Sequence, residues 1–143
     1  MSNPITITAT VSAPLEKVWE CWNQPKHITY WAFASETWEA PLAENDLRVG
    51  GKFKTTMAAK DKSSQFDFEG TYTAVEKYRL IVYGMSDGRQ VNIEFTPASD
   101  GVEIVQTFDP ETENDIEMQR SGWQAILNNF KKYCENANNK HSS

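Results

Sequence analysis

The chain has 143 residues, the length of a single domain, and its 39% hydrophobic and 24% charged residues exclude wholesale disorder. The net charge of −6 argues against a nucleic-acid-binding protein, because neutralising phosphates requires a basic surface. No apolar run is long enough to span a membrane, and the N-terminus carries no secretory signal. We therefore expect a cytoplasmic protein that binds neither membranes nor nucleic acids.

The first elements are a strand and two short helices. Residues 5–11 alternate and are β-branched, which predicts a strand. Ser12 is expected to cap the next helix, and Pro14 fits its first turn. The inward face of that helix carries Leu15, Val18, Trp19 and Trp22. Pro25 ends it, and a helical turn over residues 26–31 is predicted to point Ile28 and Trp31 inward.

Six strand-like segments follow, joined by tight turns that favour an antiparallel meander. They are residues 36–39, 52–59, 66–75, 80–83, 91–95 and 102–108. Alternation in the two longest predicts one inward face made of Phe53, Thr55, Met57, Ala59, Phe66, Phe68, Gly70, Tyr72 and Ala74. By the same alternation, Asp67, Glu69, Glu94 and Glu103 should face solvent.

A long amphipathic helix is predicted over residues 112–137, and it must cover the apolar face of the sheet. Thr112 and Asp115 resemble a capping box at its start. Gly122 costs the helix about 1 kcal/mol relative to alanine, so we expect it to mark a close approach or space left for something else. Residues 1–137 are thus read as one domain, followed by a disordered polar tail over 138–143.

The cysteines and histidines give no sign of a metal centre. Cys21 and Cys134 fall on apolar helix faces and are expected to be packing residues with free thiols. His141 lies in the tail, and His27 is expected to be a surface or capping residue, with a place at the mouth of a pocket as the alternative. Structural zinc requires four close ligands, so we predict no metal and no cofactor.

Short motifs at characteristic spacing run through nearly the whole chain, from Ile5 to about Glu135. They are Ser12-Ala13-Pro14 with Val18-Trp19, the segment from Pro25 to Trp31, Asp46-Leu47-Arg48-Val49-Gly50-Gly51-Lys52-Phe53, Gly70-Thr71-Tyr72, and Gly122-Trp123 with Ile126, Leu127 and Phe130. Their order resembles the START-like, helix-grip superfamily that includes the birch-pollen allergen and the polyketide cyclases. Within it, the chain is similar to the activator-of-heat-shock-protein-90-ATPase-like family.

This resemblance implies an α+β helix-grip fold: a curved antiparallel sheet around the long C-terminal helix, with two short helices after the first strand. Two departures from the family pattern stand out. Glu76-Lys77-Tyr78 replaces the prolines common after the Gly70 strand. Full co-chaperones of this name also carry an additional N-terminal domain, for which we expect no room in this chain, and a shared fold does not imply a shared activity.

A curved sheet that grips one helix often leaves a cavity between the two, and inward-facing residues are the candidate lining. The candidate ligand-binding residues are Trp31, Phe53, Met57, Phe66, Phe68, Tyr72, Tyr83, Phe95, Trp123, Leu127 and Phe130. Alternating aromatic residues are equally typical of an ordinary core, so each candidate keeps that second interpretation. Arg89, after a hairpin glycine, is expected to be a solvated turn residue, with binding of an acidic ligand group as the alternative.

The function that we expect is binding of a small hydrophobic or amphipathic ligand by a monomer, with entry through the loops around Trp31 and the turn at residues 60–65. A protein-interaction module with a chaperone partner is the first alternative, because the family name implies one and the solvent face of the sheet is acidic. A cyclase- or hydrolase-like enzyme is the second. It comes last because no catalytic residues can be assembled in the pocket.

Overall fold

Seven strands and three helices make up the computed structural model, which describes the backbone of residues 4–142 and the side chains of residues 4–136. In chain order they are β1 (Ile5–Val11), α1 (Leu15–Asn23), α2 (Pro25–Ile28), β2 (Trp38–Asn45), β3 (Lys52–Ala59), β4 (Gln65–Glu76), β5 (Leu80–Gly84), β6 (Gln90–Ala98), β7 (Gly101–Phe108) and α3 (Ile116–Ser142). No helix among the described residues is long and apolar enough to cross a membrane.

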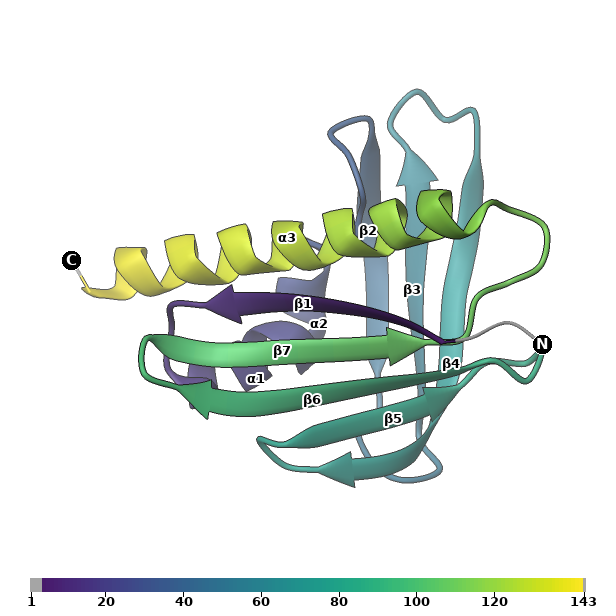
Figure 1. Cartoon of the computed structure of the whole chain (residues 1–143). Helices are drawn as coiled ribbons and strands as arrows, with labels where there is room; N and C mark the ends of the chain where they lie inside the picture. The colour runs from purple at the N-terminus through teal and green to yellow at the C-terminus, as the bar shows by residue number, and fades with distance from the viewer. Residues whose placement is uncertain (1–3, 143) are drawn as a thin grey trace.

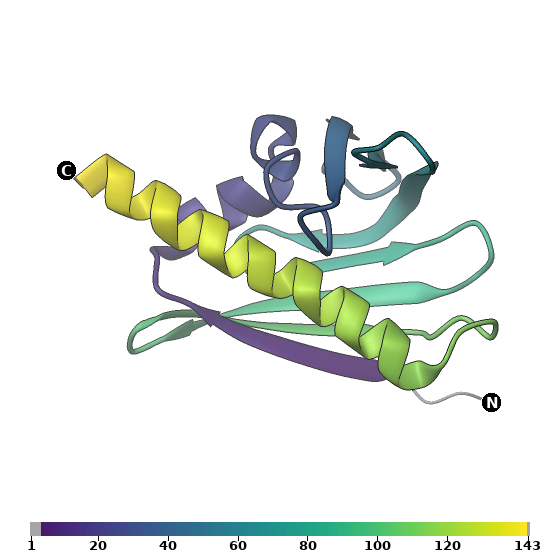
Figure 2. The same ribbon diagram turned by 90° about the horizontal axis from the view of Figure 1, so that it is seen from above.

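The strands form one antiparallel sheet in the order β1-β7-β6-β5-β4-β3-β2. The sheet curls so strongly that β2 and β3 run across the direction of β6 and β7, and α3 lies along its hollow side (Figure 1). Seen from above, α1 and α2 lie next to the C-terminal half of α3 (Figure 2). This arrangement confirms the predicted α+β helix-grip fold.

The hollow face of the sheet carries the core. Ile81, Ile93 and Ile104 come from three neighbouring strands and are all at most 1% exposed. The predicted solvent face is also confirmed, since the four carboxylates expected there are exposed: Asp67, Glu69, Glu94 and Glu103. One face of the sheet is therefore packed and the other solvated, as is common for antiparallel sheets.

A β-bulge near the end of β4 corrects the predicted alternation. Tyr72 pairs with Tyr83, but the next pair joins Ala74 to Val82, so one extra residue interrupts the ladder. A bulge of this kind reverses which side chains face inward from that point on. Val75, opposite the buried Ile81, therefore packs against the core, and the prediction that Ala74 faces inward is wrong.

The second strand is longer than the segment 36–39 that its sequence predicted. It pairs with β3 from Trp38 to Asn45, with an irregularity between Glu39 and Leu42 that contains Pro41. Because β2 is an edge strand, a proline there costs little pairing. The extra length brings Asn45 beside the end of α1, where its amide donates to the Asn23 carbonyl at 2.7 Å.

Side chains of α3 hold it against the edge strand β1. Gln124 Nε2 donates to the Thr8 carbonyl at 3.1 Å, and Arg120 Nη1 donates to the Thr6 carbonyl at 3.3 Å. The helix begins at Ile116, four residues later than predicted, and its backbone continues to Ser142, through most of the segment 138–143 that was expected to be a tail. The side chains of that segment, His141 included, lie outside the described residues.

The start of α1 differs from the prediction at Ser12. Pro14 occupies the N-cap position and no side chain caps the helix, so the prediction that Ser12 caps it is wrong. The Ser12 backbone N–H instead donates to Glu135 Oε2 at 2.8 Å, and Lys131 Nζ lies 2.6 Å from the same oxygen. Burial raises the pKa of the Glu135 carboxyl, but the hydrogen bonds from Lys131 and Ser12 outweigh it and lower that pKa. The contact ties α3 to the loop between β1 and α1.

Candidate ligand-binding cavity

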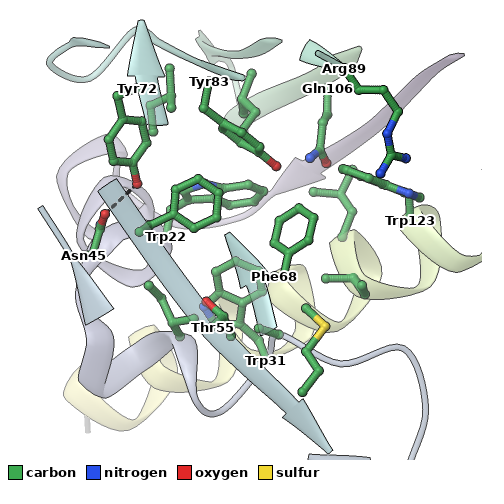
Figure 3. Close-up of a pocket in the computed structure, with 18 of the residues that line it drawn as sticks. Trp22, Trp31, Asn45, Thr55, Phe68, Tyr72, Tyr83, Arg89, Gln106 and Trp123 are labelled. Carbon is green, nitrogen blue, oxygen red and sulfur yellow. Dashed lines mark hydrogen bonds between the residues drawn. The ribbon is translucent and has the colours of Figure 1, made fainter. Parts of the chain in front are cut away.

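A cavity of about 400 Å³ lies between the hollow face of the sheet and α3, within the range of known small-molecule sites (Figure 3). Its lining comes from α1, α2 and the segment after it, the strands β2 to β7, the β5–β6 turn, the loop after β7, and α3. The lining residues are Trp22, Ile28, Trp31, Ala32, Asn45, Phe53, Thr55, Met57, Phe66, Phe68, Tyr72, Ile81, Tyr83, Arg89, Ile93, Gln106, Glu111, Asn114, Trp123, Ile126 and Leu127. Most are apolar, as is usual for such sites.

Nine of the eleven candidate residues line this cavity. They are Trp31, Phe53, Met57, Phe66, Phe68, Tyr72, Tyr83, Trp123 and Leu127. Their rings contact one another around the wall: Phe53 packs edge-on against Tyr83 at 4.7 Å between centroids, and Phe68 packs edge-on against Trp123 at 5.9 Å. The wall is therefore built of large rings that hold each other in place.

The other two candidates, Phe95 and Phe130, point inward as expected but are not among the residues that line the cavity. Both are buried in the core, at 1% and 0% exposure. Trp22 packs edge-on against each of them, at 5.8 and 4.8 Å between centroids, and presents its own surface to the cavity. Trp22 of α1 therefore lies between these two phenylalanines and the cavity, and forms the part of the wall that they were expected to form.

The exposed lining residues mark where the cavity meets solvent. Phe66, in β4, is 49% exposed, and Asn114, in the loop before α3, is also exposed. The turn at residues 60–65, where entry was predicted, directly precedes Phe66. Trp31 was expected beside the opening too, but it is only 5% exposed and its indole N–H donates to the Cys21 carbonyl at 2.8 Å.

One group of polar residues in the cavity wall is fully paired. The Tyr72 hydroxyl donates to Asn45 Oδ1 at 2.5 Å, and the Asn45 amide in turn reaches the Asn23 carbonyl. Burial raises the pKa of the Tyr72 phenol, although the Asn45 hydrogen bond offsets part of this effect. This chain of hydrogen bonds joins β4, β2 and the end of α1, so its role is structural.

A second group of polar residues faces the cavity without such pairing. Within the described part of the chain, no hydrogen bond is made by the Tyr83 hydroxyl, the Gln106 amide or the Thr55 hydroxyl, although these residues are only 5 or 6% exposed. Burial raises the pKa of Tyr83, so its phenol stays protonated at neutral pH and can donate a hydrogen bond. The three groups are available to a molecule inside the cavity.

Arg89 is part of the cavity wall and not the solvated turn residue that was expected. It follows the β5–β6 turn, and its side chain is 29% exposed. Its Nε donates to Asp87 Oδ2 at 2.7 Å, and its backbone N–H donates to Asp87 Oδ1 at 3.0 Å. Figure 3 shows the guanidinium group beside Gln106 and Trp123.

The cysteines and the histidine lie elsewhere. Cys21 and Cys134 are both fully buried, and their thiols interact across α1 and α3. The hydrogen bond that Cys134 donates to Cys21, together with burial, raises the pKa of Cys134. His27 is outside the cavity lining, with Nδ1 2.6 Å from the Tyr133 hydroxyl. No three His, Cys, Asp or Glu side chains among the described residues are grouped as a metal site would require.

Sequence reasoning missed several lining residues, and some of them carried a signal. Gln106 alternates with Ile104 and Phe108 on the inward face of β7, where a polar residue is unusual. Trp22 completes the apolar face of α1. No such signal marks three further lining residues, Asn45, Glu111 and Asn114. They lie at the end of a strand or in a loop, and only the curvature of the sheet brings them to the cavity.

Comparisons with known proteins agree with this architecture. Residues 12–135 match the family described as "Activator of Hsp90 ATPase homolog 1-like protein". The solution structure of an AHSA1-like protein from Aeromonas hydrophila is 43% identical, with a TM-score of 0.89 over 94% of each chain. A protein from Cytophaga hutchinsonii is 54% identical, with a TM-score of 0.81 over 95% of this chain and 94% of its own.

A more distant structure, from Chromobacterium violaceum, shares the fold at 24% identity and a TM-score of 0.83, covering 94% of this chain and 99% of its own. No curated protein matches the chain. The family match spans most of the sequence, and the Aeromonas and Cytophaga structures cover nearly all of it. The chain therefore belongs to the activator of Hsp90 ATPase homolog 1-like family.

Proposed function

We propose that the protein binds a small hydrophobic or amphipathic molecule in the cavity between the sheet and α3. The observation that carries the proposal is the combination of an apolar cavity of about 400 Å³ with polar side chains that face it without a partner in the described chain. Polar groups that line a cavity and have no partner in the chain can hydrogen-bond to whatever occupies it. The apolar walls would supply affinity and the polar groups orientation.

The test is an NMR titration that follows the indole N–H signals of the five tryptophans. Trp22, Trp31 and Trp123 line the cavity, whereas Trp19 packs against Tyr78 and Phe95 outside it. A panel of lipids and aromatic compounds should include members that shift the three lining signals saturably and leave Trp19 unchanged. Shifts spread over all five signals, or no shifts at any of them, would contradict the proposal.

A pair of variants makes the test specific to the cavity. Thr55→Phe places a ring into the cavity from β3, and it should abolish the saturable shifts. Thr71→Phe makes the same change on the opposite face of the neighbouring strand β4, since the adjacent Tyr72 points inward, and it should leave binding intact. Equal binding by both variants would place the ligand elsewhere.

Interaction with a chaperone is the second candidate function. It is favoured by the family description, which names the Hsp90 ATPase, and by the exposed carboxylates on the convex face of the sheet, Asp67, Glu69, Glu94 and Glu103. A purified Hsp90-type chaperone should then hydrolyse ATP faster in the presence of this protein. Replacing Glu69 and Glu94 by glutamine should remove the stimulation, whereas Thr55→Phe should not.

A further inference from the structure

One end of the cavity gathers three hydrogen-bonding side chains from different elements. Tyr83 comes from β5, Arg89 from the β5–β6 turn and Gln106 from β7. Figure 3 shows the Tyr83 hydroxyl and the Gln106 amide pointing into the same region, with the Arg89 guanidinium next to Gln106. The positive charge of Arg89 acts on the Tyr83 phenol and lowers its pKa, although burial dominates and the net shift is upward.

Two of these groups are polar groups that face the open cavity without a partner in the described chain. Gln106 is 6% exposed and Tyr83 is 5% exposed, and neither polar group bonds to another described residue. A cavity lined mainly by aromatic and aliphatic side chains gives them nothing else to bond. The partner they fit is therefore a polar group of the molecule that occupies the cavity.

The charge and the donor geometry of Arg89 indicate which kind of polar group the ligand would carry at this end of the cavity. Arg89 is the one Lys or Arg side chain among the lining residues, and its Nε is already bonded to Asp87, which fixes the orientation of the planar group. The terminal N–H donors remain, arranged in the fork that matches a carboxylate. The Asp87 carboxylate would repel a bound anion, but its side chain is 52% exposed, so water screens this repulsion.

Glu111 is the one carboxylate in the lining, and it belongs to the loop before α3. Its Oε1 accepts a hydrogen bond from the Asn114 backbone N–H at 2.6 Å, so it closes that loop. Neither Arg89 nor Gln106 bonds to it in the described structure. The donors of the polar end are thus not consumed by an acidic residue inside the cavity.

We propose that this end of the cavity is a carboxylate subsite, in which Arg89, Gln106 and Tyr83 donate hydrogen bonds to the acid group of an amphipathic ligand. The apolar remainder of that ligand would lie between Phe68, Trp123 and the other aromatic walls. This inference rests on the proposed function and specifies its ligand class: a monocarboxylic acid with an apolar body.

The test compares three molecules with the same eight-carbon chain and different head groups: sodium octanoate, 1-octanol and octylammonium chloride. Affinities are measured from the Trp123 indole N–H shift at constant ionic strength. Octanoate should bind more tightly than 1-octanol, by a factor of roughly ten or more, since charge-assisted hydrogen bonds contribute more binding free energy than neutral ones. Octylammonium should bind most weakly.

Two arginine variants separate the subsite from general electrostatics. Arg89→Gln should weaken octanoate binding roughly tenfold to a hundredfold while changing 1-octanol binding little. Arg79→Gln removes the same charge from an exposed arginine that pairs with Glu76 outside the cavity, and it should change neither. Gln106→Leu keeps the side-chain volume and should reduce the preference for octanoate severalfold.

The possible outcomes separate failure of the carboxylate subsite from failure of ligand binding in the cavity. If octanoate and 1-octanol bind equally well, or if Arg89→Gln leaves their ratio unchanged, the carboxylate subsite is refuted and ligand binding stands. Equal losses in the two arginine variants would also refute it. If none of the three molecules moves the tryptophan signals, both the subsite and the proposed cavity function fail for this ligand class.

Discussion

Gly70 should be sensitive to substitution, because the missing side chain makes room for the aromatic wall of the cavity. It lies opposite Phe53 in the β3–β4 ladder. A Cβ atom at Gly70 would lie 2.5 Å from Phe53 Cε2 and 2.9 Å from Tyr83 Cδ1, whereas an ordinary contact begins at 3.4 Å. In Gly70→Ala the Phe53 ring must therefore retreat by about 0.9 Å, into the cavity.

The cost of this change follows from two opposing effects. Overpacking of a core usually costs about 1–3 kcal/mol, while alanine gains about 0.4–1 kcal/mol over glycine by restricting the unfolded chain. We expect a net loss of about 1–2 kcal/mol, which lowers the Tm by roughly 3–6 °C for a domain of this size. The displaced Phe53 ring should also weaken ligand binding.

Thermal unfolding followed by circular dichroism measures the effect, with Gly84→Ala as the matched control. Gly84 is at the end of the neighbouring strand β5, and the nearest atom to its added Cβ would be the Arg89 carbonyl oxygen at 4.0 Å. That variant should be as stable as the parent or slightly more so. Equal melting temperatures for the two alanine variants would refute the reasoning.

Three further predictions concern stability and reactivity. Gly122→Ala should raise stability by about 0.5–1 kcal/mol in urea denaturation, because Gly122 lies inside α3 and no atom is within 4 Å of the added Cβ. Above about pH 10, stability should fall by about 1.4 kcal/mol per pH unit for each of Tyr72 and Tyr83, since burial raises both pKa values and only the unfolded chain ionises. Cys21 and Cys134 should resist a thiol reagent until the protein unfolds.

Each of these has a result that would contradict it. A destabilised Gly122→Ala would mean that α3 approaches another element at that point. Tyr83→Phe should remove its share of the alkaline slope, and an unchanged slope would mean that Tyr83 ionises in the folded state. Thiol labelling faster than unfolding, measured at several urea concentrations, would mean that α1 separates from α3 by local opening.

The sequence predicted those elements whose pattern is local. Alternation from Phe66 to Tyr72 assigned the inward face of β4 correctly, because a strand turns each successive side chain to the opposite side. It failed at Ala74, because a bulge depends on how the partner strand pairs and not on the strand itself. The length of β2 was missed for the same reason, since it is set by β3.

The candidate site divides in the same way. The hydrophobic pattern by itself determined which rings turn inward, because burial drives apolar residues to one face of each element, and this is how Phe68, Trp123 and Leu127 could be named in advance. Only the tertiary structure decided that Phe95 is buried in the core while Trp22 lines the cavity. It also decided that Arg89 and Gln106 lie at the same end of the cavity. The physical reason is that a cavity is a gap in packing between elements, fixed by the curvature of the sheet and the position of α3, and no single segment encodes either.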